Sequence, residues 1–258
     1  MHIIPGIILG IVQGLTEFLP LSSSGHLVIV SKLLGIPENL PFDIAVHFAT
    51  LLAVCLFFIG DIMLILKAFF IERDPKSPYF RLGLLVIVAS IPTAIIGFSL
   101  EKVFEQMFSS VTAVGFFLML TGILIMTAER YSRARKDVSK VSFLDSLIVG
   151  LAQGCAIAPG LSRSGTTISA CLLTGMDRTL ACRFSFLLSI PAILGATIFK
   201  SKVILHNVTP GMIAGFIAAA ICGYIAIGFF MRMIEKKKIT IFAYYCLIVG
   251  AVTVILSR

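Results

Sequence analysis

Charged side chains are scarce in this sequence of 258 residues. Asp, Glu, Lys and Arg make up 13% of the chain, apolar residues make up 58%, and the mean hydropathy is +1.05. A soluble domain of this length does not need so apolar a composition. The scarcity of charge argues against an ordinary soluble protein and predicts an integral membrane protein.

Several familiar motifs are also missing. The sequence has no Walker A motif, no GxGxxG and no HExxH, which removes the simplest support for nucleotide-driven transport, a dinucleotide fold and zinc proteolysis. The six cysteines occur singly, without CxxC spacing, and this favours reduced, buried packing residues. The amino terminus has no basic region followed by a small-residue cleavage site, so we expect the first segment to belong to the mature fold.

Long apolar segments are what the sequence does contain. A stretch of about 20 apolar residues suffices to cross a bilayer as a helix. Six segments meet this pattern: Ile44–Gly60, Leu82–Leu100, Val111–Ala128, Phe184–Phe199, Met212–Met231 and Ile239–Leu256. We therefore predict an all-α polytopic membrane protein with six full spans in a single membrane domain, residues 1–258.

Two further apolar regions, residues 3–34 and 143–173, are interrupted near their middle by Pro, Gly, Ser and charged residues. The interruptions read FLPLSSSGH and APGLSRSGTT, and each half is too short to span a bilayer. Broken segments survive at membrane depth only when they are buried in protein or line a wet cavity. We interpret both regions as re-entrant helical hairpins.

The two interrupted regions are similar to each other at an offset of 140 residues. Seven of the sixteen positions from Gly10 to Gly25 are identical at this offset, and they include the unusual Gln, Gly and Ser residues. This indicates an internal duplication. Each hairpin is followed by three spans, which predicts two repeats of opposite orientation, residues 1–128 and 143–258, in an inverted-topology arrangement.

The net charge of +8 reflects membrane topology better than nucleic-acid binding, because the basic residues fall in short loops. With six spans, one side holds five basic residues, Lys32, Lys102, Lys200, Lys202 and Arg258, and the other holds fifteen. The richer side should be cytoplasmic, which leaves both termini outside. The hairpins then enter from opposite faces, and their polar tips can meet inside the membrane.

Gln13 and Glu17 lie four residues apart in the first hairpin and share one helix face. A carboxylate at membrane depth requires a cation, a metal ion or water, and this marks Glu17 as a functional candidate. The alternative is a solvated Glu17 near the interface. His47 and Asp43 lie near the start of the first span, and we leave both outside the predicted site because an acid there commonly faces interfacial water.

Each hairpin tip carries a serine-rich turn that opens a helix. Helix N-termini bind anions through free backbone N–H groups, and Arg163 adds a planar, permanently charged fork suited to phosphate. The predicted substrate-binding residues are Gln13, Ser22, Ser24 and Gly25 of the first hairpin, and Ser162, Ser164, Gly165 and Thr166 of the second. Ordinary N-capping is the alternative for these serines, and pairing with Glu17 is the alternative for Arg163.

His26 follows Ser22 by four residues and Ser23 by three, within reach of either hydroxyl if the turn continues into a helix. It is a candidate base, acid or nucleophile, although a lone histidine is commonly a structural hydrogen-bonder.

The segments QGLTEFLPLSSSGHL and PGLSRSGTT, in this order and separation, resemble the two signature motifs of the undecaprenyl-diphosphate phosphatase family, also called bacitracin-resistance proteins. The first motif has Glu or Gln, three intervening residues and Glu. These positions fall on Gln13 and Glu17, and the following serine and histidine fall on Ser23 and His26. The arginine of the second motif falls on Arg163. Many family members have Glu in place of Gln13 and Thr in place of Ser24.

The resemblance implies a hydrolase of the bacterial inner membrane that converts undecaprenyl diphosphate to undecaprenyl phosphate. This reaction recycles the carrier lipid of peptidoglycan synthesis and removes the lipid target of bacitracin. It implies catalytic roles for Glu17, Ser23, His26 and Arg163. Glu17, helped by Gln13, would bind Mg²⁺ or Ca²⁺, and the attacking group would be Ser23, His26 or water.

A secondary transporter or polyprenyl-phosphate flippase is the alternative function, because inverted repeats with broken helices also build carriers. A carrier needs no nucleophile, and this favours the phosphatase. Gly211 and Gly215 permit close helix contact, as in a homodimer.

Overall fold

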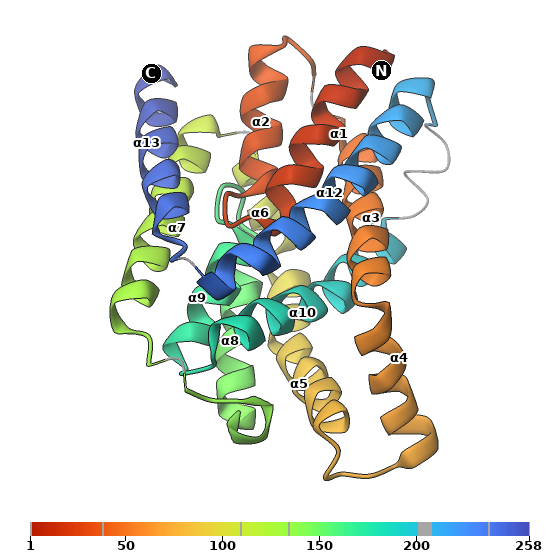
Figure 1. Ribbon diagram of the computed structural model, residues 1–258. Coiled ribbons are helices and arrows are strands. Elements are labelled where there is room, and N and C mark those ends of the chain that lie inside the picture. The colour runs from red at the N-terminus through yellow and green to blue at the C-terminus, as the bar shows by residue number, and fades with distance from the viewer. Residues whose placement is uncertain are drawn as a thin grey trace.

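The computed structural model describes residues 2–37, 39–108, 110–133, 135–200, 208–236 and 238–257 (Figure 1). These residues are predominantly helical, and they form no strand beyond an isolated bridge between Lys136 and Met176. The first half contains α1 Ile3–Phe18, α2 Ser23–Leu33, α3 Leu40–Phe57, α4 Ile59–Lys67, the π-helix Ala68–Glu72, α5 Pro78–Ser99, α6 Glu101–Phe108 and α7 Val111–Tyr131. The second contains the 3₁₀ turn Val138–Lys140, α8 Phe143–Cys155, α9 Arg163–Leu173, α10 Arg178–Phe199, α12 Pro210–Lys236 and α13 Thr240–Leu256.

Five of these helices are long and apolar enough to cross a membrane: α3, α5, α7, α10 and α12. They coincide with five of the six predicted spans. The sixth predicted span falls on α13, which is apolar but has 17 residues. The chain is thus an all-helical, multi-pass membrane protein, and the exact number of crossings stays a prediction.

Both interrupted regions form two short helices joined at a turn. Phe18 ends α1 and Ser23 begins α2, while Cys155 ends α8 and Arg163 begins α9. Pro20 follows the end of α1, and Pro159 and Gly160 follow the end of α8, so neither first helix continues through its interruption. A serine directly before the second helix caps its first turn.

The two halves exchange their short helices. The first helix of the first hairpin, α1, packs on α12 of the second half, and α8 packs on α5 of the first half. Glycines make both approaches possible, because a Cβ on Gly10 would lie 2.2 Å from the carbonyl oxygen of Gly215, and one on Gly150 would lie 2.0 Å from that of Ala89. Gly211 likewise lies against Gly6 of the same chain, so the glycines that suggested a dimer contact are covered by α1.

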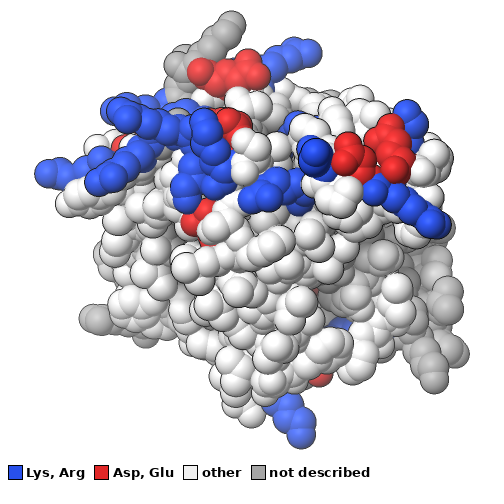
Figure 2. All heavy atoms as spheres, turned by 90° about the horizontal axis from the view of Figure 1, so that it is seen from below, with Lys and Arg blue, Asp and Glu red and all other residues white. Residues whose placement is uncertain are grey.

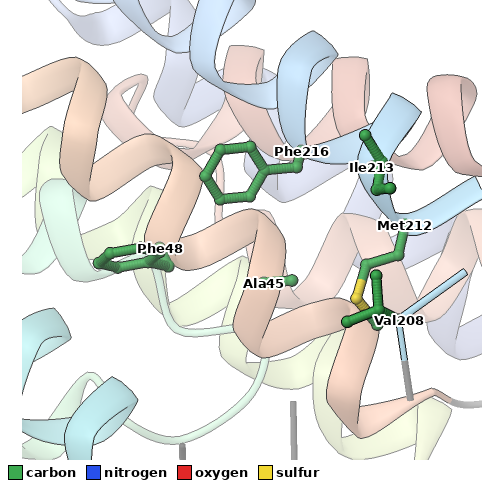
Figure 3. A pocket seen from close by; sticks show the side chains of 6 residues that line it. All are labelled: Ala45, Phe48, Val208, Met212, Ile213 and Phe216. Carbon is green, nitrogen blue, oxygen red and sulfur yellow. The ribbon is translucent and has the colours of Figure 1, made fainter. Parts of the chain in front are cut away.

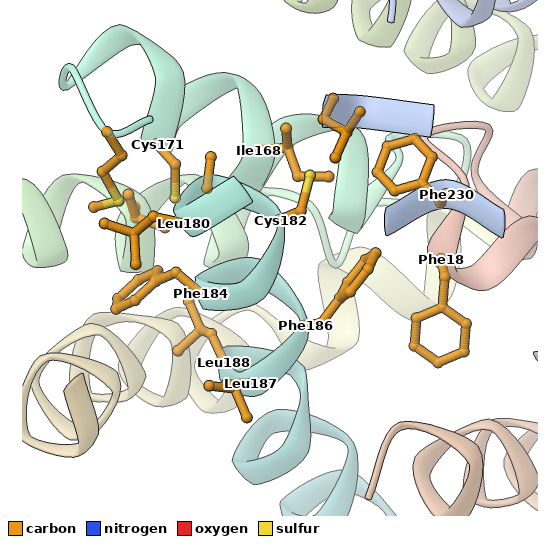
Figure 4. Close-up of a cluster of buried hydrophobic side chains, with 14 of the residues drawn as sticks. Phe18, Ile168, Cys171, Leu180, Cys182, Phe184, Phe186, Leu187, Leu188 and Phe230 are labelled. Atoms are coloured by element: carbon orange, nitrogen blue, oxygen red, sulfur yellow. The ribbon is translucent and has the colours of Figure 1, made fainter. Parts of the chain in front are cut away.

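A cluster of buried apolar side chains joins the end of α1 to α9, α10 and α12 (Figure 4). Phe18, the neighbour of Glu17, is fully buried and meets Phe186 of α10 edge to face, with ring centroids 5.4 Å apart. Phe230 of α12 packs against Phe186 from another side. The end of α1 is therefore anchored in a rigid core.

Charged side chains are distributed unevenly over the surface. In the view from below in Figure 2, Lys and Arg gather in a band across part of the face, and much of the remaining surface carries no charge. Along the sequence, the segment between α7 and α8 is rich in basic residues, among them Arg133, Lys136 and Lys140. Three of the basic residues counted in the orientation prediction, Lys202, Lys237 and Arg258, lie outside the described residues.

Candidate active site

The tips of the two hairpins meet inside the molecule. The hydroxyl of Ser164, in the first turn of α9, donates a hydrogen bond of 3.0 Å to the carbonyl oxygen of Leu19, which directly follows α1. Next to it, the guanidinium Nη2 of Arg163 donates to Oε1 of Glu17. An acid from the first half and a cation from the second half are thus paired at a site where Glu17 is only 6% exposed.

The Glu17 carboxylate is surrounded by hydrogen-bond donors. Its Oε2 accepts a hydrogen bond of 2.5 Å from the hydroxyl of Ser23 and one of 2.9 Å from Nε2 of Gln13. Gln13 precedes Glu17 by one helical turn, the spacing that places two side chains on one face. A buried carboxylate is tolerated only with such compensation, and the donors fix its orientation toward Ser23.

The turn that presents Ser23 has an unusual backbone. Ser22 adopts φ 68° and ψ 93°, a region that residues other than glycine rarely occupy. Its hydroxyl accepts from the backbone N–H of Gly25 at 3.2 Å and lies 3.4 Å from the hydroxyl of Ser24. Such a conformation costs about 1–3 kcal/mol, persists only where the surroundings enforce it, and is common at functional sites.

The second tip offers unpaired donors. Ser162 caps α9 by accepting from the N–H of Gly165 at 3.1 Å, and its hydroxyl lies 3.3 Å from that of Ser164. Nη1 of Arg163 and the hydroxyl of Thr166 are buried without a hydrogen-bond partner. Because unpaired buried donors are uncommon in folded proteins, Nη1 in particular indicates a site for an oxyanion.

His26 takes part in a different set of hydrogen bonds from the one predicted. Its Nδ1 lies 2.8 Å from the carbonyl oxygen of Ser22, and its Nε2 lies 2.8 Å from the hydroxyl of Tyr245 on α13. The Ser23 hydroxyl instead donates to Glu17, and His26 does not line the adjacent cavity. The structure therefore places His26 against the serine turn, where it contacts the backbone of Ser22 rather than the hydroxyl of Ser23.

A cavity of about 760 Å³ adjoins the paired tips. Its walls combine the polar tip residues Glu17, Ser23 and Arg163 with an apolar stretch that includes Phe98 and Phe199. A charged pair between Glu101 and Lys200, 3.3 Å apart, lines another part of it. This combination suits an amphiphile whose anionic head lies at the tips and whose apolar part contacts the aromatic wall.

His47 is a site residue that the sequence analysis left out. It lies on α3, lines the cavity, and its Nε2 is 3.6 Å from Oε2 of Glu17. Its Nδ1 is held by the carbonyl oxygen of Asp43 at 2.7 Å, and Asp43 also lines the cavity. The sequence analysis left both residues outside the predicted site, whereas the structure places both on the wall of the cavity. The sequence did contain a signal for this placement, because Asp43 and His47 are polar residues four positions apart in an otherwise apolar span.

The oxygen ligands at the tips fit a cation that arrives with phosphate rather than a preformed metal centre. Among the described residues, no group of three or more His, Cys, Asp or Glu side chains is arranged to hold a metal ion. Mg²⁺ is commonly held by one or two carboxylates together with substrate phosphates. Glu17 lines the cavity. Gln13 does not line it, but its amide oxygen is buried beside Glu17 without a partner, so it is a second candidate oxygen ligand.

A smaller groove of about 200 Å³ lies between α3 and α12 (Figure 3). All of its lining residues are apolar: Ala45, Phe48, Val208, Met212, Ile213 and Phe216. It offers no acid, base or nucleophile, so the chemistry belongs to the larger cavity.

Comparisons with known proteins agree with this geometry. The family model described as bacitracin resistance protein BacA matches residues 6–252. A curated protein of Methanobrevibacter smithii is 44% identical over 268 residues, which cover 98% of this chain and 96% of that protein. Relatives from Carboxydothermus hydrogenoformans and Halothermothrix orenii are 43% and 44% identical, with 100% of this chain covered and 98% and 99% of theirs. All three are named undecaprenyl-diphosphatase.

Proposed function

The chain belongs to the bacitracin resistance protein family, and from this premise we propose that it is an undecaprenyl-diphosphatase. It hydrolyses undecaprenyl diphosphate to undecaprenyl phosphate and inorganic phosphate. The reaction recycles the carrier lipid of cell-wall synthesis and confers bacitracin resistance by removing the drug's lipid target. The observation that carries the proposal is the contact of Ser23 and Arg163 with one buried carboxylate on the wall of an amphiphilic cavity.

Ser23 is the attacking group in this scheme. Its hydroxyl already donates to Glu17 at 2.5 Å, the geometry of a nucleophile and its general base. Oγ bonds to the terminal phosphorus, and the bond from that phosphorus to the bridging oxygen breaks. The bridging oxygen keeps the electron pair and becomes an oxygen of undecaprenyl phosphate. The Ser23 proton passes to Glu17 and from there to the departing phosphate.

Water completes the reaction. It attacks the phosphoserine, its oxygen bonds to phosphorus, and the bond from phosphorus to Oγ breaks. Glu17 accepts a proton from the water and returns it to Oγ, which restores Ser23 and leaves inorganic phosphate. One carboxylate thus serves both steps, because Oε2 faces Ser23.

Arg163 supplies the main electrostatic stabilisation. The charge of a transferring phosphoryl group is spread over its outer oxygens, and positioned cations lower the energy of that state. Nη2 is held by Glu17 while Nη1 has no partner, so Nη1 is available for a phosphate oxygen. Of the other predicted phosphate-binding residues, Ser22, Ser24 and Ser162 line the cavity beside Arg163. The remaining four do not line it and instead hold the two turns through hydrogen bonds: Gly25, Ser164, Gly165 and Thr166.

His26 acts on the serine turn in this proposal, through the Ser22 carbonyl, instead of exchanging a proton with Ser23. His47 acts from the cavity side, where a protonated ring is close enough to pair with Glu17. Gln13 orients the same carboxylate through its amide N–H.

The cofactor is a divalent cation, Mg²⁺ or Ca²⁺, held by Glu17 and Gln13 together with the diphosphate. When bound, it neutralises charge on the phosphate oxygens. The residues described above perform the positioning and the proton transfers.

The membrane arrangement that we propose has six spans and two re-entrant hairpins in an inverted repeat, residues 1–128 and 143–258. The exchange of α1 and α8 between the halves supports it, since equivalent glycines, Gly10 and Gly150, make both contacts. The uneven basic charge supports insertion in the cell membrane with both termini outside.

Phosphate release by detergent-purified protein tests the function. Undecaprenyl diphosphate should yield inorganic phosphate and undecaprenyl phosphate. The same protein in vesicles, given a labelled polyprenyl phosphate, tests the carrier alternative. Lipid translocation without phosphate release would identify a flippase and overturn the proposal.

A further inference from the structure

Tyr245 is connected to the serine turn of the site through His26 and lies outside the cavity lining. Its hydroxyl lies 2.8 Å from Nε2 of His26, and the two rings are nearly parallel, 14° apart with centroids at 5.6 Å. Tyr245 lies on α13, in the second half, whereas His26 lies in the first hairpin. Neither side chain lines the cavity, so the pair acts on the site through other residues.

Two hydrogen bonds connect Tyr245 to Ser22 through His26, and the donor and acceptor of each can be assigned. A carbonyl oxygen only accepts, so Nδ1 of His26 donates to the carbonyl of Ser22 at 2.8 Å. Nε2 of a neutral ring is then the acceptor, and the Tyr245 hydroxyl donates to it. Every group in this chain has a partner of the correct kind, which fixes both the tautomer and the angle of the ring.

This series of hydrogen bonds ends at Ser22, the residue of the site with a strained backbone. Ser22 has φ 68°, and apart from Arg73 it is the only non-glycine residue with positive φ in the described ranges. Its carbonyl accepts from both the ring and the backbone N–H of His26, the latter at 3.1 Å. Two bonds from one residue thus enforce the turn, and the next residue is Ser23.

The second hairpin has a comparable support without the strain. Ser162, which lies 140 residues after Ser22, has φ −67°, and its backbone N–H donates to the hydroxyl of Thr121 on α7 at 2.9 Å. Each turn is therefore held by a long helix of the opposite half. Only the first turn needs an aromatic pair, in keeping with its unusual backbone.

We propose that Tyr245 is a positioning residue for the reaction. Its hydroxyl fixes His26, His26 holds Ser22 at positive φ, and this places Oγ of Ser23 on Glu17. The inference rests on the proposed phosphatase activity, in which Ser23 attacks. It also gives His26 a role that requires no contact with substrate.

A double-mutant cycle, measured on undecaprenyl diphosphate hydrolysis, tests whether Tyr245 and His26 act through one series of hydrogen bonds. Tyr245→Phe keeps the ring and removes the donor, and we expect kcat to fall about 3- to 10-fold, the effect of one neutral hydrogen bond. His26→Phe should lower kcat about 10-fold or more, and adding Tyr245→Phe to it should cause no further loss. KM should change less than about twofold in each variant, because neither residue lines the cavity. Tyr244→Phe, at the exposed neighbouring position, is the matched control.

Thermal unfolding in detergent shows whether the variants remain folded, and kcat is expressed per folded protein. A wild-type kcat for Tyr245→Phe, or a full additional loss in the His26→Phe background, would overturn the inference.

The ¹⁵N shift of Nε2 of His26, assigned with His26→Phe, gives a readout without turnover, and it should move in Tyr245→Phe. An unchanged ¹⁵N shift of Nε2 in Tyr245→Phe would also contradict the proposed hydrogen bond between Tyr245 and His26. A moved shift in a protein that releases no phosphate would leave the hydrogen bonds standing and remove the phosphatase proposal instead.

Discussion

Ser23 and Arg163 occupy equivalent positions in two similar segments, 140 residues apart, and contact the two oxygens of one carboxylate. The Ser23 hydroxyl donates to Oε2 of Glu17 and the Arg163 guanidinium to Oε1. The residue equivalent to Glu17 in the second segment is Ile157. Two similar hairpins thus carry different chemistry, and the site needs both.

Replacement of Ser23 tests the attacking group. Ser23→Ala should lower kcat by about a thousandfold or more, because Ser23 is the only residue in the described part of the chain whose hydroxyl bonds to the Glu17 carboxylate. Ser24→Ala, one residue away, should cost about tenfold at most. Phosphate release is measured for both, and wild-type protein quenched during turnover should carry phosphate on Ser23. If Ser23→Ala retains a tenth of the activity, His26 or water is the nucleophile.

His47 should contribute through its close approach to Glu17, where Nε2 lies 3.6 Å from Oε2. His47→Leu removes this polar neighbour of the buried carboxylate, and kcat should fall about tenfold, because an electrostatic contact to a charged group is lost. His47→Gln retains an N–H at similar reach and should recover most of the loss. The kcat values of the two variants are compared at one pH. Equal kcat values for Leu and Gln would show that the 3.6 Å approach has no role.

Removal of divalent cations should reduce turnover. With EDTA, phosphate release is expected to drop at least about tenfold, and added Mg²⁺ or Ca²⁺ should restore it, because the cation offsets charge on the diphosphate. Gln13→Leu should raise the cation concentration needed for half-maximal activity. Full activity after exhaustive chelation would remove the cofactor from the account.

The exchanged helix contacts should be sensitive to a single methyl group. Gly150→Ala would place its Cβ 2.0 Å from the carbonyl oxygen of Ala89, so α8 must move away from α5. We expect a loss of about 1–3 kcal/mol, the usual cost of overpacking, measured as a lower thermal midpoint in detergent. Gly60→Ala, where nothing lies within 4 Å, should be neutral. An unchanged midpoint for Gly150→Ala would contradict the packing.

The sequence was most informative where polar residues interrupt apolar segments. A carboxylate within an apolar segment requires a compensating partner, and the matching motif pointed to Arg163, so their proximity could be predicted. The contact of His47 with Glu17 could not, because it depends on how α3 packs beside the first hairpin. The same holds for His26, whose partner Tyr245 lies 219 residues away. The glycine pattern of α12 suggested a second copy, yet only the fold shows that α1 covers it.

Glu17→Gln and Arg163→Ala, measured beside wild type for phosphate release from undecaprenyl diphosphate, test the central claim most directly. Glu17→Gln keeps the size of the side chain and removes the base, while Arg163→Ala removes the stabilising cation. Each should lower kcat by about a hundredfold or more, whereas Arg183→Ala, which breaks an ion pair with Asp61 away from the cavity, should retain most of the activity of its folded fraction. Near-normal turnover by either Glu17→Gln or Arg163→Ala would contradict the account.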